Sequence, residues 1–202
     1  MENSQNDDVK AKSSIWGWIV VLLIALAAAV GHAFGRFSYG VVLPAVRDDM
    51  GITNALAGSI GAANVSAYLL GTIVVAWATS RFRLASVMRL GLVLVTLGLL
   101  IASLATGPWS LAAGLSLTGM GGAFLWIPSP VIAADALPEN KRHLAVGLLG
   151  SGIGLGIVFV STLSGWLRDI EGDSAWSTIY STKFSIASVS YTHLTLPTSD
   201  LV

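Results

Sequence analysis

The residues best suited to chemistry lie near the start of the chain, where "GHAFGRFSYG" (residues 31–40) follows the apolar run "IWGWIVVLLIALAAAV". His32, Arg36 and Tyr39 are spaced i, i+4 and i+7, which places them on one face of an α-helix. A guanidinium binds a carboxylate or phosphate through two hydrogen bonds at once. An imidazole can gain or lose a proton near neutral pH. This face is therefore a candidate site for binding a solute and relaying a proton.

Each of these side chains also has a structural interpretation. Arg36 binds a substrate or takes part in gating if it faces a wet cavity. Otherwise it forms a structural ion pair or anchors the helix at the membrane interface. His32 relays protons or packs between helices, bonded to a carbonyl or a water. Tyr39 lines a pocket or simply packs. The sequence leaves these alternatives open.

Two further segments carry polar or bulky groups inside apolar surroundings. Asn64 and Tyr68 are spaced i, i+4, so they share a helix face that meets other helices or lines a cavity. Trp126 lies well inside another apolar segment, in "FLWIPSP". Proline within a helix bends it and frees a carbonyl. We expect Trp126 and its prolines to shape the cavity more than to bind solute directly.

All eleven acidic residues lie in tails, connections or helix ends. None lies in the interior of an apolar segment, so no carboxylate there can carry a proton or neutralise Arg36. Proton coupling would need His32, a carboxylate in a missing part of the protein, or a proton carried by the substrate. An anionic substrate or the missing part must also supply the charge opposite Arg36.

The sequence gives little support for an enzyme or for a metal-binding, nucleotide-binding or nucleic-acid-binding protein. There is no cysteine, and the apolar segments contain no acid pair, Cys/His cluster or Ser/His/Asp set, so we expect no enzyme activity and no metal site. "GSGIGLG" (residues 150–156) lacks nucleotide-binding spacing and lies in an apolar helix, so we expect no cofactor. A net charge of zero gives no reason to expect a nucleic-acid partner.

The composition indicates an all-α integral membrane protein. The 202-residue chain is 54% hydrophobic and only 11% charged, against about 25% charged residues in soluble domains. Lipid accepts helices or closed barrels, and the long apolar runs lack the period-2 alternation of a barrel. After a tail at 1–14, we expect helices at residues 15–45, 54–79, 85–106, 109–134 and 143–167, and a truncated sixth from 175 to 186.

The placement of Lys and Arg sets the expected orientation. Seven of these residues flank one set of connections (Lys10, Lys12, Arg81, Arg83, Arg89, Lys141 and Arg142), and only Arg47 and Arg168 lie on the other side. By the positive-inside rule the N-terminus is cytoplasmic. We therefore expect a multi-pass protein of the bacterial inner (plasma) membrane.

Two features of the C-terminal third complete the pattern. Gly150 and Gly154, like Gly152 and Gly156, have the small-xxx-small spacing that lets membrane helices approach closely. The end, "SVSYTHLTLPT", resembles translated sequencing-adapter read-through, so we interpret residues 187–202 as a non-native tail. A genuine soluble tail is the alternative.

Three stretches carry a resemblance to a known family: "GHAFGRFSYGVVLPAVRDDMGIT", "GAANVSAYLLGTIVVAWATSRFR" and "GLSLTGMGGAFLWIPSPVIAADALPENKR". They resemble the N-terminal half of a major facilitator superfamily (MFS) transporter, in the YbfB-like subgroup. Arg81 and Arg83 correspond to the basic residues of the family's gating motif between helices 2 and 3. Ser80 stands where that motif has an Asp, and its turn glycine is absent.

The resemblance implies the fold and the function. Five complete helices and a truncated sixth would form one six-helix half, and the missing C-terminal half would complete a twelve-helix protein. Helices 1, 2, 4 and 5 would border a cavity between the halves, and rocking of the halves would give alternating access. We expect secondary active transport of a small organic solute, with a proton as one candidate coupling ion. The alternative is a non-transporting membrane fragment or assembly partner.

Overall fold

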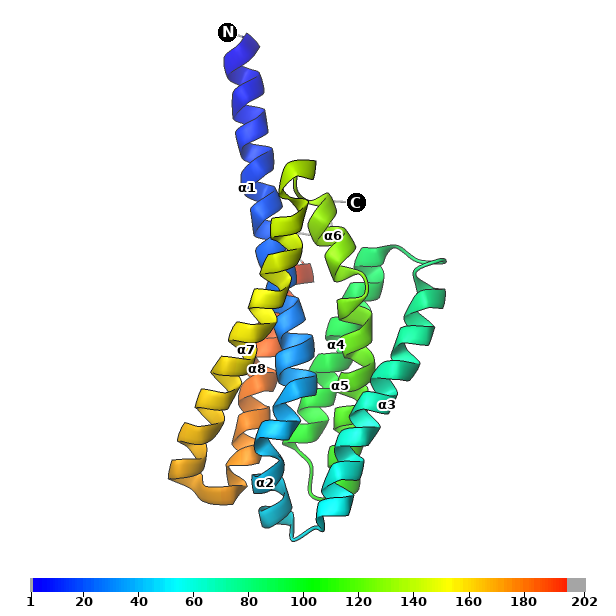
Figure 1. The fold of residues 1–202 in the computed structure, drawn as a ribbon, viewed down its shortest axis with the longest axis vertical. Helices are drawn as coiled ribbons and strands as arrows, with labels where there is room; N and C mark the ends of the chain where they lie inside the picture. Colours follow the sequence, from blue (N-terminus) through cyan, green and yellow to red (C-terminus); the bar gives the residue numbers. More distant parts are fainter. Residues whose placement is uncertain (1, 196–202) are drawn as a thin grey trace.

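The computed structural model describes residues 2–195, and the side chains of residues 15–190. The described chain is all-helical, as predicted, and five stretches are long and apolar enough to cross a membrane. These are Ile15–Met50, Asn54–Ala78, Leu84–Ser103, Pro108–Asp135 and Glu139–Ser190. The last stretch contains two helices, which lie side by side and are joined by a tight turn (Figure 1).

The first membrane helix is continuous but not uniform. It consists of α1 (Glu2–Ala28), the π-helix η1 (Ala29–Phe37) and α2 (Ser38–Met50). At the end of η1 the Ser38 N–H donates to the carbonyl of Ala33, the i→i−5 pattern of a π-helix. A π turn contains more residues than an α turn, so side chains after η1 point in other directions than an α-helical count predicts. The predicted tail at 1–14 is helical from Glu2 onward.

The second and third membrane helices are α3 (Asn54–Ala78) and α4 (Leu84–Ser103). Gly51, with a φ of 60°, ends α2 in a left-handed turn, which glycine adopts without steric cost. Thr53 then caps α3, because its Oγ1 accepts a hydrogen bond from the Leu56 N–H at 3.3 Å.

The fourth membrane helix is broken near its end. It comprises α5 (Pro108–Trp126) and α6 (Ser129–Asp135), separated at Ile127 and Pro128. Proline lacks an N–H and clashes with the preceding turn, so the α5 hydrogen-bond ladder stops and α6 starts anew. The break leaves Trp126 at the last turn of α5.

The fifth apolar stretch contains α7 (Arg142–Glu171), preceded by the 3-10 turn η2 (Glu139–Lys141). It continues into α8 (Ala175–Thr195), preceded by the 3-10 turn η3 (Gly172–Ser174). The predicted end of the sixth helix is residue 186, and α8 extends nine residues beyond it. Its hydroxyls bond to carbonyls of the same helix, as Thr182 and Ser185 do to Thr178 and Ser181. Polar residues therefore fit a helix in apolar surroundings. The native or non-native origin of residues 187–202 stays a prediction.

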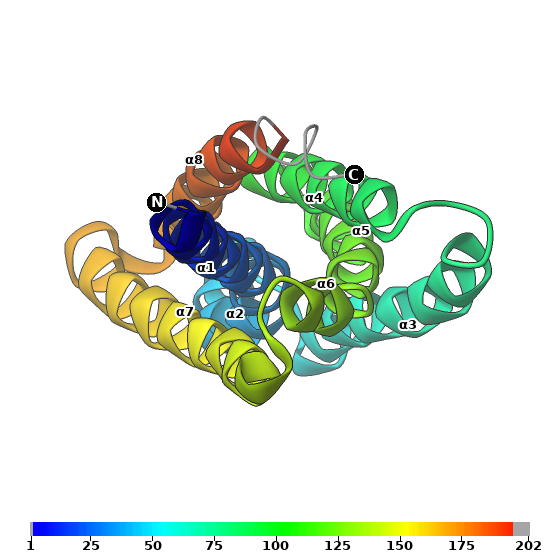
Figure 2. The same ribbon diagram turned by 90° about the horizontal axis from the view of Figure 1, so that it is seen from above.

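Glycines bring α4 and α5 into backbone contact. A Cβ atom at Gly98 would lie 2.7 Å from the Gly114 carbonyl oxygen, and one at Gly121 would lie 2.8 Å from that of Gly91. On its other face α5 meets α3, where a Cβ at Gly119 would overlap the Asn64 carbonyl oxygen. α5 thus lies tightly between α3 and α4, while α1 and η1 pack against α7, and α8 packs against α4 (Figure 2).

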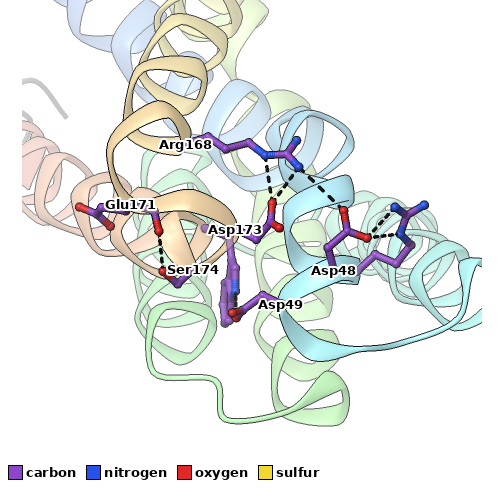
Figure 3. A network of polar contacts seen from close by, with 8 residues as sticks. Asp48, Asp49, Arg168, Glu171, Asp173 and Ser174 are labelled. Atoms are coloured by element: carbon purple, nitrogen blue, oxygen red, sulfur yellow. Dashed lines mark hydrogen bonds and ion pairs between the residues drawn. The ribbon is translucent and has the colours of Figure 1, made fainter.

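The connections alternate between the two ends of the bundle, as expected when successive helices cross a membrane in opposite directions. The α2–α3, α4–α5 and α7–α8 connections lie at the end opposite the N-terminus (Figure 1). A polar network holds this end together: Arg168 pairs with Asp173 at 2.7 Å and with Asp48 at 3.8 Å, and the Trp176 indole donates to Asp49 at 2.7 Å (Figure 3). The two ion pairs are exposed, and exposed pairs contribute at most about 1 kcal/mol each.

The α3–α5 contact gives a stability prediction. Gly119→Ala places a methyl group against the Asn64 backbone, which cannot move aside. We expect a loss of about 1–3 kcal/mol and a lower thermal unfolding temperature in detergent. Gly58→Ala is the matched control, because a Cβ at Gly58 on α3 meets nothing within 4 Å. Equal unfolding temperatures for the two variants would contradict the contact.

Candidate functional site

Four of the predicted site residues come together at one place. His32 and Arg36 on η1 meet Tyr68 on α3 and Trp126 on α5, and Phe37 joins them. We call these five residues the Arg36 cluster. The His32 ring centroid lies 5.0 Å from that of Trp126 and 5.8 Å from that of Tyr68. Three segments far apart in the sequence therefore contribute to one site.

Arg36 is held by aromatic faces. Its Cζ lies 4.0 Å from the ring centroid of Tyr68 and 5.5 Å from that of Phe37. Cation–π contacts contribute about 0.5–2 kcal/mol each, depending on desolvation. Among the side chains of residues 15–190, no carboxylate pairs with Arg36. The N–H groups at the edge of the guanidinium thus remain available to donate hydrogen bonds to another group.

The remaining members of the cluster differ in exposure. His32 is 5% exposed, and its Nδ1 has no hydrogen-bond partner among the described residues. Arg36, Tyr68 and Trp126 are half-buried, and Phe37 is 46% exposed. The cluster therefore reaches the surface of this bundle, with a polar edge from Arg36 and an apolar, aromatic lining.

Tyr39 does not share the face of His32 and Arg36, which corrects the sequence-based i, i+4, i+7 assignment. Its Oη donates to the Ala57 carbonyl at 2.8 Å, and its ring packs against Gly61 on α3. The reason is η1: His32 and Arg36 lie within the π segment and Tyr39 follows it, so an α-helical count does not give the direction of Tyr39. Tyr39 thus joins helices together.

Asn64 also joins helices. It is 1% exposed, and its Nδ2 donates to the carbonyls of Leu115 at 2.6 Å and Gly35 at 3.2 Å and to Thr118 Oγ1 at 3.1 Å. Thr118 Oγ1 in turn donates to the Gly35 carbonyl at 2.8 Å. These bonds connect η1, α3 and α5, the elements that carry the Arg36 cluster. Asn64 is therefore a positioning residue one turn from Tyr68.

Arg81 and Arg83, the predicted gating residues, lie apart from the Arg36 cluster. Arg81 and Arg83 are exposed in the connection between α3 and α4, at the end of the bundle that also carries the N-terminus (Figure 1). A role in gating remains a proposal for them.

The glycine pair that packs is not the predicted one. A Cβ at Gly150 or Gly154 would meet nothing within 4 Å, whereas one at Gly152 would lie 2.9 Å from the Ala25 carbonyl oxygen. At Gly156 a Cβ would lie 2.8 Å from the Ala33 side chain. Both pairs have the same spacing, so the sequence could not tell which face of α7 meets α1 and η1. Gly152 and Gly156 make that contact.

Two residues outside the predicted site contribute to this region. Thr118 binds Gly35 and Asn64, as described above, and Lys183 is fully buried on α8 beside Ser38. A signal for Lys183 was present in the sequence, because it is the one charged residue between Asp173 and Asp200. Thr118 carried no such signal, since hydroxyls are common in membrane helices.

The family comparison agrees with this architecture. The family model described as Major Facilitator Superfamily matches residues 25–190, which is most of the chain. The chain belongs to the major facilitator superfamily. It is thus a multi-pass protein of the lipid bilayer, and its function is the membrane transport of a small-molecule solute. No curated protein matches the chain.

The two faces of α7 in this MFS protein give a second prediction. Gly152→Leu forces α7 away from Ala25, so we expect a lower thermal unfolding temperature in detergent. Gly150→Leu adds a similar side chain on the open face and should leave that temperature nearly unchanged. If Gly150→Leu is the more damaging variant, the assignment of the packed face is wrong.

Proposed function

We propose that this protein is a secondary active transporter that moves a small organic anion by alternating access, with the Arg36 cluster as its solute site. The observation that carries the proposal is the state of Arg36. It lies within the apolar stretch Ile15–Met50 against aromatic faces, and no carboxylate of the described chain pairs with it. A charge in such a place marks a functional site by default.

The geometry favours an anion. A guanidinium stacked on Tyr68 presents its N–H edge in a fixed plane, which suits the two oxygens of a carboxylate. Phe37, Tyr68 and Trp126 add apolar surface for the organic part of the solute, and the free Nδ1 of His32 adds a polar contact. Small-molecule sites combine these same features, an apolar lining with a few polar groups.

We further propose that this chain forms the N-terminal half of the transporter. The half-buried state of Arg36, Tyr68 and Trp126 supports this proposal, because a second six-helix half would cover them and enclose the solute. In the same proposal, the N-terminus lies in the cytoplasm of a bacterial cell and Arg81 and Arg83 contribute to gating. Membership of the YbfB-like subgroup rests on the sequence resemblance.

The alternative is a non-transporting membrane protein that assembles with another chain. The sequence of the locus beyond residue 186 distinguishes the two proposals. A second set of six apolar helices in frame supports the transporter, and their absence contradicts it.

The proposal predicts the effect of removing the guanidinium. In the full-length protein, Arg36→Ala should lower uptake of carboxylates into proteoliposomes by at least roughly 100-fold, since an unpaired buried anion costs about 3 kcal/mol or more. Arg36→Lys should also fail, because an ammonium lacks the planar fork. A panel of radiolabelled small carboxylates provides the assay.

The matched control is Arg142→Ala, which removes an exposed arginine at the start of α7. It should leave uptake near the wild-type level, and all three variants should insert into the membrane normally. Unchanged uptake in Arg36→Ala would exclude Arg36 as a solute-binding residue.

A further inference from the structure

A second cation lies inside the bundle, separate from the Arg36 cluster. Lys183 on α8 is 0% exposed, and its Nζ donates to Ser38 Oγ at 2.9 Å. The same Nζ lies 3.9 Å from the ring centroid of Tyr180. Ser38 Oγ donates in turn to the Phe34 carbonyl at 2.6 Å. Lys183 thus connects α8 to the residue that directly follows η1.

The surroundings of Lys183 do not balance a fixed positive charge. An ammonium has three N–H donors, and within residues 15–190 the structure gives Nζ one hydrogen-bond acceptor and one ring face. No carboxylate of that part of the chain pairs with it. An uncompensated buried charge is costly, so these two contacts stabilise the ammonium form only in part.

The neighbouring elements supply few other titratable groups. Tyr180 on α8 is fully buried beside Ser38, and Tyr39 on α2 donates to Ala57. η1 holds His32 and Arg36 in the other cluster, and residues 15–28 of α1 contain no titratable side chain. The remaining charged groups lie in the second turn of α4 or toward the ends of α2, α7 and η3: Arg89, Arg47, Asp48, Asp49, Arg142, His143, Arg168, Asp169, Glu171 and Asp173.

We propose that Lys183 is the proton-binding site of the transporter. The Nζ lone pair of the amine takes up a proton from water on one side of the membrane, and the ammonium returns that proton to water on the other side. Ser38 Oγ and the Tyr180 ring stabilise the protonated form in between.

The position of Ser38 connects this site to the solute site. Ser38 follows the last residue of η1, and Arg36 lies two residues before it. A change in the Lys183–Ser38 bond therefore acts on the segment that carries Arg36. This coupling rests on the proposed transport function, whereas proton binding by Lys183 can be measured without any solute.

The test uses a chain in which Lys183 is the only lysine. Lys10→Arg, Lys12→Arg and Lys141→Arg remove the other three lysines and keep every charge. The protein is labelled with ¹³C-lysine, placed in lipid nanodiscs and followed by NMR through the Cε resonance, which differs between amine and ammonium. The matched control is the same chain with Lys183→Arg, which contains no lysine and therefore assigns the resonance to Lys183.

We expect the Lys183 resonance to move between the amine and ammonium positions as the pH of the nanodisc sample is varied. A Lys183 resonance that stays at either position throughout overturns the proposal. A fixed ammonium indicates a structural cation, or a second anion site if added carboxylates shift the resonance. Failure of the Arg36→Ala transport test with a moving Lys183 resonance would contradict the solute site alone.

Discussion

The structure depends on one electrostatic constraint: positive charges inside a membrane need compensation, and this chain has no interior acid to provide it. All eleven carboxylates belong to tails, connections or helix ends, while Arg36 and Lys183 lie within helices. The protein holds both cations with neutral groups. Arg36 uses the faces of Tyr68 and Phe37, and Lys183 uses Ser38 Oγ and the Tyr180 ring. Such contacts stabilise a cation only in part, and this is the basis for proposing that Arg36 binds an anion and that Lys183 exchanges a proton.

The π segment η1 and the glycine contacts position these groups. η1 directs His32 and Arg36 toward Tyr68 and Trp126, and directs Tyr39 toward Ala57. Asn64 and Thr118 then fix the Gly35 carbonyl, so that η1, α3 and α5 keep their relative places. Gly98, Gly114 and Gly119 allow α5 to approach its neighbours closely. The Arg36 cluster is therefore built on packed helices, while its polar edge stays accessible.

Most of the helix boundaries could be predicted from the sequence, because membrane helices are long apolar runs between charged or Pro/Gly-rich connections. The same logic found His32, Arg36, Tyr68 and Trp126, since polar or bulky groups at membrane depth are rare. The prediction failed where one sequence pattern is compatible with two arrangements of the helices. The spacing of Gly150 and Gly154 equals that of Gly152 and Gly156, and only packing selects the face. Tyr39 was misplaced because nothing in "GHAFGRFSYG" indicates a π-helix. Lys183 was missed because its Ser- and Thr-rich surroundings did not look like a full helix.

The central claim, that an anionic solute supplies the charge opposite Arg36, has a direct test by ligand-induced stabilisation. The purified protein is heated with a panel of small carboxylates, each paired with the primary amide of the same shape. A ligand that binds the folded state raises the unfolding temperature, by an amount that grows with its concentration over Kd. The account predicts that some carboxylates stabilise the protein while their amides do not, and that Arg36→Ala removes the difference. Equal stabilisation by both members of every pair, or stabilisation that survives Arg36→Ala, would contradict it.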